Sequence, residues 1–73
     1  MDPRFLTLAD VADTLAVSMS QVRAMVKTGE LPAIQVGGRG QWRVETAVLE
    51  DYIAGKYQEN RERVARENGV AGR

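Results

Sequence analysis

Cysteine and histidine are both absent from the 73-residue sequence. The absence of cysteine excludes disulfides, thiolate metal sites and thiol nucleophiles, while the absence of histidine excludes a Ser-His-Asp triad and removes the commonest metal ligand. The chain is also too short to enclose a substrate cavity easily. We therefore expect no catalytic residue, no metal and no cofactor, and we expect a binding protein rather than an enzyme.

Net charge and long apolar runs are lacking too. Ten Lys and Arg balance ten Asp and Glu, so no overall field draws the chain to DNA or to anionic lipid. No stretch approaches the roughly 18 apolar residues of a membrane span. Asp10 and Asp13 interrupt the apolar patch that begins at Phe5 before it could form a signal-peptide core. With 44% hydrophobic and 27% charged residues, we expect one small globular domain in the cytoplasm, with no membrane partner.

Two helix starts follow each other closely in the first third of the chain. Thr7 with Asp10, and Ser18 with Gln21, match the capping-box pattern that satisfies free N–H groups of the first helical turn. Gly29 predicts the end of the second helix. Apolar residues at helical spacing follow each start, namely Leu8, Val11, Ala12 and Leu15, then Val22, Met25 and Val26. Because only about three residues separate the helices, the pattern predicts a helix-turn-helix.

A β-hairpin is predicted after Pro32. Residues 33–36 and 41–44 form two short alternating segments, and the glycine-rich residues 37–40 form the turn between them. In the second segment we expect Trp42 and Val44 to face inward, and Gln41 and Arg43 to face outward. Trp42 is then expected to anchor the core, in contact with Leu15, Val22, Met25 and Ile53.

A third helix is predicted to start at Glu45 or Thr46. Its apolar face consists of Val48, Leu49, Tyr52, Ile53 and Tyr57, and we expect both tyrosines in the core or in an interface. Residues 58–73 form a polar tail that either extends this helix or frays. Within the tail, Glu59 with Arg63 and Glu62 with Arg66 are expected ion pairs, and Asn68-Gly69 is the expected stop. The predicted domain therefore covers residues 1–57.

Charge is unevenly distributed along the neutral chain. Residues 18–44 contain one acidic residue, Glu30, and four basic residues, which gives +3: Arg23, Lys27, Arg39 and Arg43. Residues 1–17 contain one basic and three acidic residues, which gives −2. A basic second helix next to a basic hairpin is a candidate surface for phosphate groups.

Together these motifs resemble the excisionase-type and MerR-type winged-helix DNA-binding family. The resemblance runs from Leu6 to Ile53 and includes Leu-Thr-Leu-Ala-Asp-Val-Ala at 6–12, Gly-Glu-Leu-Pro-Ala at 29–33 and Trp-Arg-Val at 42–44. It implies a mainly α, small winged helix-turn-helix whose second helix contacts bases in the major groove. It assigns recognition to Ser18, Ser20, Gln21, Arg23 and Lys27. It assigns contacts from the hairpin wing to Arg39, Gln41 and Arg43.

The resemblance implies a bacterial or phage protein that binds double-stranded DNA. We expect a small, nucleoid-associated transcriptional regulator without a small-molecule effector, acting with further copies of itself on repeated sites. A phage-type excisionase that bends DNA to direct recombination is an alternative. A protein-interaction module is another, favoured by zero net charge and by Ala24, which lies where such proteins often carry a second basic residue.

Overall fold

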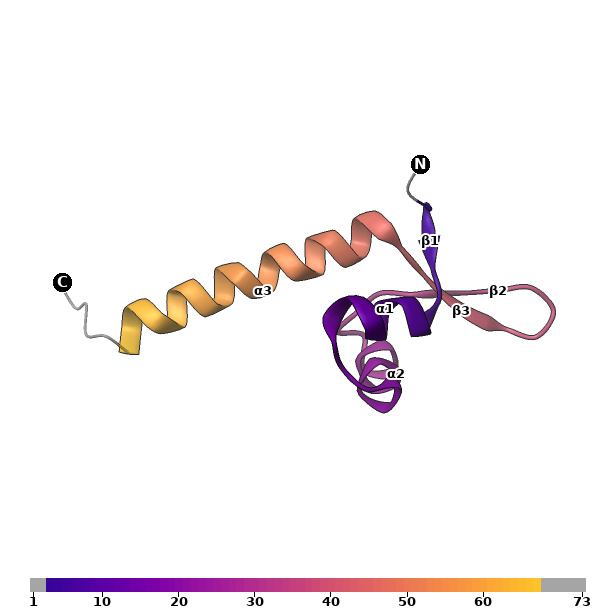
Figure 1. Ribbon diagram of the computed structural model, residues 1–73, viewed down its shortest axis with the longest axis horizontal. Coiled ribbons are helices and arrows are strands. Elements are labelled where there is room, and N and C mark those ends of the chain that lie inside the picture. Colours follow the sequence, from indigo (N-terminus) through magenta and orange to yellow (C-terminus); the bar gives the residue numbers. More distant parts are fainter. Residues whose placement is uncertain (1–2, 68–73) are drawn as a thin grey trace.

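Two helices, a hairpin and a long helix follow one another along the chain (Figure 1). The computed structural model describes residues 3–67. Helix α1 spans Leu8–Leu15 and helix α2 spans Met19–Thr28. Strands β2 and β3 span Ile34–Val36 and Gln41–Glu45, and helix α3 spans Thr46–Glu67. The predicted order of helix-turn-helix, hairpin and C-terminal helix is therefore confirmed.

Capping side chains set where the first two helices begin. Thr7 Oγ1 accepts a hydrogen bond from the Asp10 backbone N–H, and Asp10 Oδ2 accepts one from the Thr7 N–H, both at 3.0 Å. Ser18 Oγ accepts from the Gln21 backbone N–H at 3.1 Å. The first capping box is therefore complete, whereas Ser18 supplies the only side-chain bond found at the start of α2 in the described chain.

Nine buried apolar side chains join α1, α2, β3 and α3 into one core. Val22 and Met25 belong to it, as predicted, while Leu15 and Ile53 lie half-buried against it. The full set is Leu8, Val11, Ala12, Val22, Met25, Val26, Leu31, Val44 and Leu49. Because α2 contributes three of these side chains and Met19 packs against them, the polar residues of α2 are held facing away from the body.

Strand β1 (Phe5–Leu6) is an element that the sequence analysis did not predict. It pairs antiparallel with β3, so the sheet has three strands in the order β1-β3-β2. Its register sets Leu6 opposite Val44, and the Thr46 backbone N–H donates to the Arg4 carbonyl at 2.8 Å. The start of the chain is thereby attached to the point where β3 becomes α3.

Trp42 is not part of the core, and the prediction that it anchors the helices is wrong. Its side chain is 36% exposed, although it shares a sheet face with Val44, which is fully buried. Trp42 pairs with Gln35, one position from the pair that adjoins the turn, and the hairpin as a whole projects beyond the helices (Figure 1). The predicted face is correct, but the core ends at Val44.

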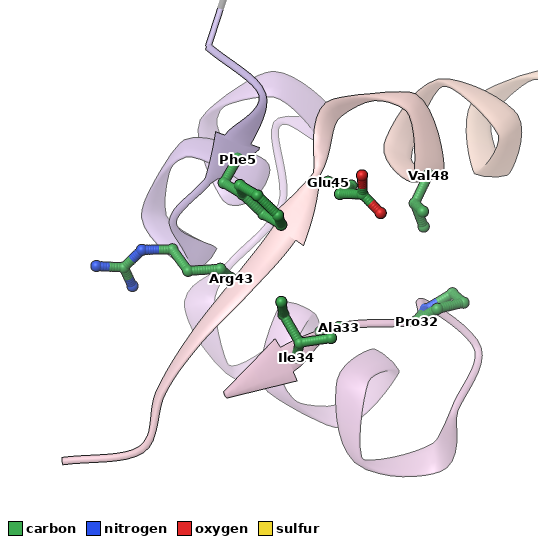
Figure 2. A pocket seen from close by; sticks show the side chains of 7 residues that line it. All are labelled: Phe5, Pro32, Ala33, Ile34, Arg43, Glu45 and Val48. Carbon is green, nitrogen blue, oxygen red and sulfur yellow. The ribbon is translucent and has the colours of Figure 1, made fainter. Parts of the chain in front are cut away.

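Apolar side chains are also exposed on the opposite face of the sheet. The register pairs Phe5 with Glu45 and Ile34 with Arg43, which places all four on the face away from Val44. Phe5 is 39% exposed and Ile34 is 50% exposed. They line a shallow hollow of about 130 Å³ together with Pro32, Ala33 and Val48 (Figure 2).

A polar cluster attaches α3 to the segment that follows α2. The Tyr52 hydroxyl donates to Glu30 Oε2 at 2.8 Å, and Lys56 Nζ lies 3.3 Å from the same oxygen. The hydrogen bond from Tyr52, then that from Lys56, lowers the pKa of Glu30. Burial, then the bond to Glu30, raises the pKa of Tyr52, and the bond to Glu30 raises the pKa of Lys56.

Helix α3 runs past the end of the predicted domain without a break. Residues 58–67 are helical, so the tail extends α3 as far as Glu67, and every residue from 54 to 67 is exposed. Tyr57 is 68% exposed, so of the two places expected for it the core is excluded and an interface remains. The expected stop at Asn68-Gly69 lies outside the described residues. Within residues 3–67, no helix combines the length and apolar character that crossing a bilayer requires.

The two ion pairs expected in the tail are not formed in the described chain. Glu59 Oε1 instead accepts from Lys56 Nζ at 3.4 Å, three residues away. Glu62 Oε2 accepts from Gln58 Nε2 at 3.1 Å, four residues away. The helical spacing is as expected, but the partners differ, because several side chains compete for each carboxylate on an exposed helix.

Candidate nucleic-acid interface

The exposed face of α2 carries every recognition residue assigned to it from the sequence. Burial of Val22, Met25 and Val26 fixes the rotation of the helix, so the residues between them face solvent. The exposed set comprises Ser18, Ser20, Gln21, Arg23 and Lys27. Ala24 lies exposed among them, so the middle of this face is small and uncharged.

The Ser18 hydroxyl can accept one hydrogen bond and donate another at the start of α2. Its oxygen accepts from the Gln21 backbone N–H, while its own hydroxyl hydrogen stays available to donate. The first N–H groups of a helix also attract anions through the helix dipole. The start of α2 can therefore bind a phosphate oxygen without losing its cap.

The hairpin places Arg39 in its turn. The Gly40 N–H donates to the Gly37 carbonyl at 3.2 Å, which closes residues 37–40 into a tight turn. Gly37 and Gly40 have φ of 77° and 63°, a left-handed conformation that glycine adopts without steric cost. Arg39 is thus held exposed at the end of the hairpin by the backbone alone.

Arg43 and Gln41 form a local pair on the outer face of the sheet. Arg43 Nη2 donates to Gln41 Oε1 at 3.1 Å, and Arg43 Nη1 donates to the Trp42 carbonyl at 2.8 Å. These bonds use two of the five guanidinium donors, and the others remain for a ligand. Figure 2 shows the guanidinium pointing away from the hollow that Phe5 and Ile34 line.

The four basic side chains of this region form no ion pair with any described residue. No carboxylate lies within 4.0 Å of Arg23, Lys27, Arg39 or Arg43 in the part of the chain that the structure describes. Elsewhere, by contrast, Arg4 pairs with Glu45 at 3.2 Å. Cations that are not neutralised by their own protein can displace counterions from a polyanion. Arginines of α3 are unpaired as well within residues 3–67, but residues 18–44 combine four unpaired cations with a single acidic residue, Glu30, which makes α2 and the hairpin the most positive part of the chain.

The structure groups the predicted residues into two clusters. One lies along α2 and the other on the hairpin, and within residues 3–67 no hydrogen bond or ion pair joins the two. Trp42, which the sequence analysis assigned to the core, adds an exposed indole to the hairpin cluster. The closeness of Trp42 to the glycine-rich turn at residues 37–40 is the sequence signal that could have indicated its exposure.

The chemistry available to these clusters is binding of anions and hydrogen-bonding edges. Short polar groups and an arginine lie on α2, and two further arginines lie on the hairpin. No group of three His, Cys, Asp or Glu side chains that could hold a metal is found among residues 3–67.

Comparison with known proteins agrees with this geometry. A family model described as a helix-turn-helix domain matches residues 5–57, about three quarters of the chain. The matched segment begins at β1 and ends inside α3. No curated protein and no solved structure gives a significant match.

Proposed function

This chain is a DNA-binding helix-turn-helix protein of the excisionase-like helix-turn-helix domain family, and from that premise we propose that it recognises a specific duplex sequence through α2 and the hairpin. The observation that carries the proposal is the set of four unpaired cations on these two elements. In this proposal α2 enters the major groove and the hairpin lies along the sugar-phosphate backbone.

Each candidate residue has a role that its chemistry suits. Ser20, Gln21 and Arg23 contact base edges, because a hydroxyl can hydrogen-bond to a base, and an amide and a guanidinium can each make paired hydrogen bonds to one. Ser18 and Lys27 contact phosphates along the groove, and Arg39, Gln41 and Arg43 do so from the hairpin. Phosphate contacts fix the register of α2 on the duplex, and the base contacts then select the sequence.

Tight binding requires more than one copy of the chain on the DNA. A single small module buries only about 600–1,000 Å² of protein surface against a duplex. Copies on neighbouring repeats gain affinity per site only by contacting each other as well as the duplex. In this proposal they do so, and two adjacent sites therefore bind more tightly, per site, than one.

Regulation of transcription is the proposed role. A small domain that occupies a chosen site can block a polymerase or another protein by its presence, so this role needs no pocket and no catalytic group. A phage-type excisionase would use the same contacts and would also bend the duplex. A gel assay with the site placed at different positions along one fragment separates these roles, because a bend makes mobility depend on position.

The experiment that tests the proposal starts with a pool of random duplexes. Repeated selection on the full chain yields a preferred site, and fluorescence anisotropy then compares that site with a scrambled duplex. We expect the selected site to bind at least ~10³-fold more tightly than the scrambled one. Gln21→Ala and Arg23→Ala should each cost ~1–3 kcal/mol on the selected site and much less on the scrambled duplex.

Two results would contradict the proposal. Equal affinity for the selected and scrambled duplexes would remove sequence specificity, and no binding to any duplex at low salt would favour the protein-interaction alternative. Asp13→Asn is the matched control, because it changes one exposed polar side chain on α1, outside the proposed surface. Its affinity for both duplexes should equal that of the unaltered chain.

A further inference from the structure

Helix α3 carries a stripe of side chains that starts half-buried against the core at Ile53 and continues, from Tyr57 on, where nothing in the described chain covers it. Ile53, Tyr57, Asn60 and Val64 follow one another at intervals of four, three and four residues, which places them within about 60° of arc on a helix. The stripe continues the row that starts at Leu49, which is 3% exposed in the core. Farther along, Tyr57 is 68% exposed and Val64 is 44% exposed. The row therefore extends along α3 beyond the buried core to which its first residue belongs.

A groove lies at the base of this stripe. It measures about 260 Å³, and its lining consists of Leu15, Tyr52, Ile53, Lys56, Tyr57 and Asn60. Because Leu15 is the last residue of α1 and the other lining residues belong to α3, the groove lies between the end of α1 and the side of α3. An apolar side chain of a partner that follows the stripe would reach this groove, so the surface has both a ridge and a recess.

Basic side chains border the stripe on both sides. At 100° per residue, Arg63 lies along one border and Arg61 lies along the other, whereas Glu62 lies on the opposite side of the helix. Lys56 lies beside Arg63, but its charge is already paired with Glu30 and Glu59. Arg61 and Arg63 have no carboxylate within 4.0 Å in the part of the chain that the structure describes. The stripe ends in one acidic residue, Glu67.

These borders exclude a second copy of the chain as the natural occupant. In a parallel pair of helices each border faces the opposite border of the partner, and in an antiparallel pair it faces its own equivalent. With this sequence both arrangements bring cation against cation. A partner helix with acidic residues beside its apolar row would instead form favourable pairs on both sides.

DNA does not suit this surface as well as an acidic helix does. Residues 56–67 contain four basic and three acidic residues, so their net charge is only +1. Tyr57 and Val64, between the cations, offer a phosphate nothing to hydrogen-bond apart from the tyrosine hydroxyl. We propose that the stripe from Ile53 to Val64 is a docking site for an acidic amphipathic helix of a partner protein, formed by residues that DNA binding through α2 does not use.

The test uses the full chain and two synthetic helical peptides. Both have leucine at the first and fourth positions of each seven-residue repeat. One has glutamate at the positions that flank the leucines, and the other has lysine there. Fluorescence anisotropy with labelled peptide should show binding to the glutamate peptide and none to the lysine peptide. Tyr57→Ala combined with Val64→Ala should lower the affinity for the glutamate peptide by about tenfold or more.

Charge reversal provides the sharper variant. Arg61→Glu combined with Arg63→Glu should exchange the preference, so that the lysine peptide binds and the glutamate peptide does not. The matched control is Gln58→Ala combined with Glu62→Ala, on the opposite side of the same helix, which should leave both affinities unchanged. Circular dichroism confirms that each variant keeps its helix.

Three outcomes would overturn the proposal. These are equal binding of both peptides, loss of duplex binding instead of peptide binding in the Tyr57→Ala, Val64→Ala variant, and self-association by sedimentation that this variant abolishes. The first shows non-specific adhesion, the second shows that DNA occupies the stripe, and the third shows a homodimer. Because duplex binding is measured separately, failure of this proposal is distinguishable from failure of DNA recognition by α2.

Discussion

Ala16 is the only non-glycine residue with a left-handed backbone among residues 3–67, with φ of 57° and ψ of 45°. It ends α1, and the next residue, Val17, donates its N–H to the Ala12 carbonyl at 3.0 Å. A Cβ in this conformation costs roughly 1–2 kcal/mol, whereas glycine avoids that cost. The turn of the helix-turn-helix therefore holds local strain at one residue.

Ala16→Gly should increase the free energy of unfolding by about 0.5–1 kcal/mol. Relief of the left-handed strain gains roughly 1–2 kcal/mol, and the greater freedom of glycine in the unfolded chain offsets about 0.4–1 kcal/mol of it. The measurement is urea denaturation followed by circular dichroism.

Gly29→Ala is the matched control at the end of α2. Gly29 has φ of 86°, and a Cβ built there would have no atom within 4 Å, so only the backbone penalty changes. The free energy of unfolding of this variant should be lower by about 1 kcal/mol or more. A gain in stability for Gly29→Ala, or a loss for Ala16→Gly, would show that the two caps are not equivalent.

At the scale of elements, the cluster of Glu30, Tyr52 and Lys56 makes the attachment of α3 dependent on pH. The pKa of Glu30 is lowered in the folded chain, chiefly by the hydrogen bond from Tyr52. A lowered carboxyl pKa stabilises the fold above the unfolded value of ~4.3, and this contribution disappears as pH falls through the folded value. Stability should therefore decline on the acid side, through protonation of Glu30.

Glu30→Gln isolates that contribution. The urea midpoint of the variant should lie below that of the unaltered chain near neutral pH, and the difference should shrink as pH falls below ~4. Asp51→Asn serves as the control, since Asp51 is an exposed carboxylate on α3, next in the chain to Tyr52. If the difference in urea midpoint between Glu30→Gln and the unaltered chain stayed constant down to the lowest pH, the substitution would act through packing and not through the charge of Glu30.

Truncation after Tyr57 tests how α3 divides between its two halves. The retained half includes Leu49, Tyr52 and Ile53, whereas every residue that is removed and described is exposed. We expect cooperative unfolding to persist, with a loss of less than ~1 kcal/mol, because side-chain pairs on an exposed helix contribute only about 0.2–0.5 kcal/mol each. Calorimetry checks this. A broad transition without a cooperative peak would show that the outer half belongs to the folded core.

The elements that the sequence predicted well are those with strong local signals. Capping side chains and apolar spacing located α1 and α2, and Gly29 located the end of α2, because these interactions lie within a few residues of one another. The exposed face of α2 followed directly from the same spacing. Local chemistry was sufficient wherever the structure depends on neighbouring residues.

The differences between prediction and structure arose where residues far apart in the sequence determine strand pairing or burial. Strand β1 has two residues, too few for a periodic pattern, and it exists because β3 lies beside it. Trp42 has the phase of a buried residue, but the length of the hairpin relative to the helices determines whether anything covers it. For Tyr57 the helical spacing left the core and an interface open, and only the point at which α3 leaves the body excludes the core. None of these three features of the tertiary structure can be inferred from the spacing of apolar residues along the sequence.

For the whole molecule, charge distribution matters more than net charge. The chain is neutral, but residues 18–44 sum to +3, and their four cations have no carboxylate within 4.0 Å in the described part of the chain. If Lys27, Arg39 and Arg43 contact phosphates, the logarithm of the affinity should fall with the logarithm of salt concentration with a slope of about −2.7, three contacts at roughly 0.9 each.

Arg39→Ala and Arg43→Ala should each reduce the magnitude of that slope by roughly 0.9 and weaken all duplexes about equally. Arg66→Ala is the control, because it removes the same charge from the exposed end of α3. It should leave the slope unchanged. The measurement is anisotropy over a salt series, and an unchanged slope in the Arg39→Ala, Arg43→Ala double variant would remove the hairpin from the interface.

The projection of α3 also sets how the molecule tumbles in solution. The chain measures 54 × 28 × 18 Å, and its radius of gyration of 15.3 Å exceeds the ~11 Å of a compact chain of this length. Helix α3 lies close to the long axis (Figure 1), and the N–H bonds of a helix lie close to its own axis. Those bonds reorient only when the long axis itself turns, which is the slowest rotation of an elongated body. Amide nitrogens of α3 should therefore show faster transverse ¹⁵N relaxation than amides that lie across the long axis, wherever the helix stays rigid.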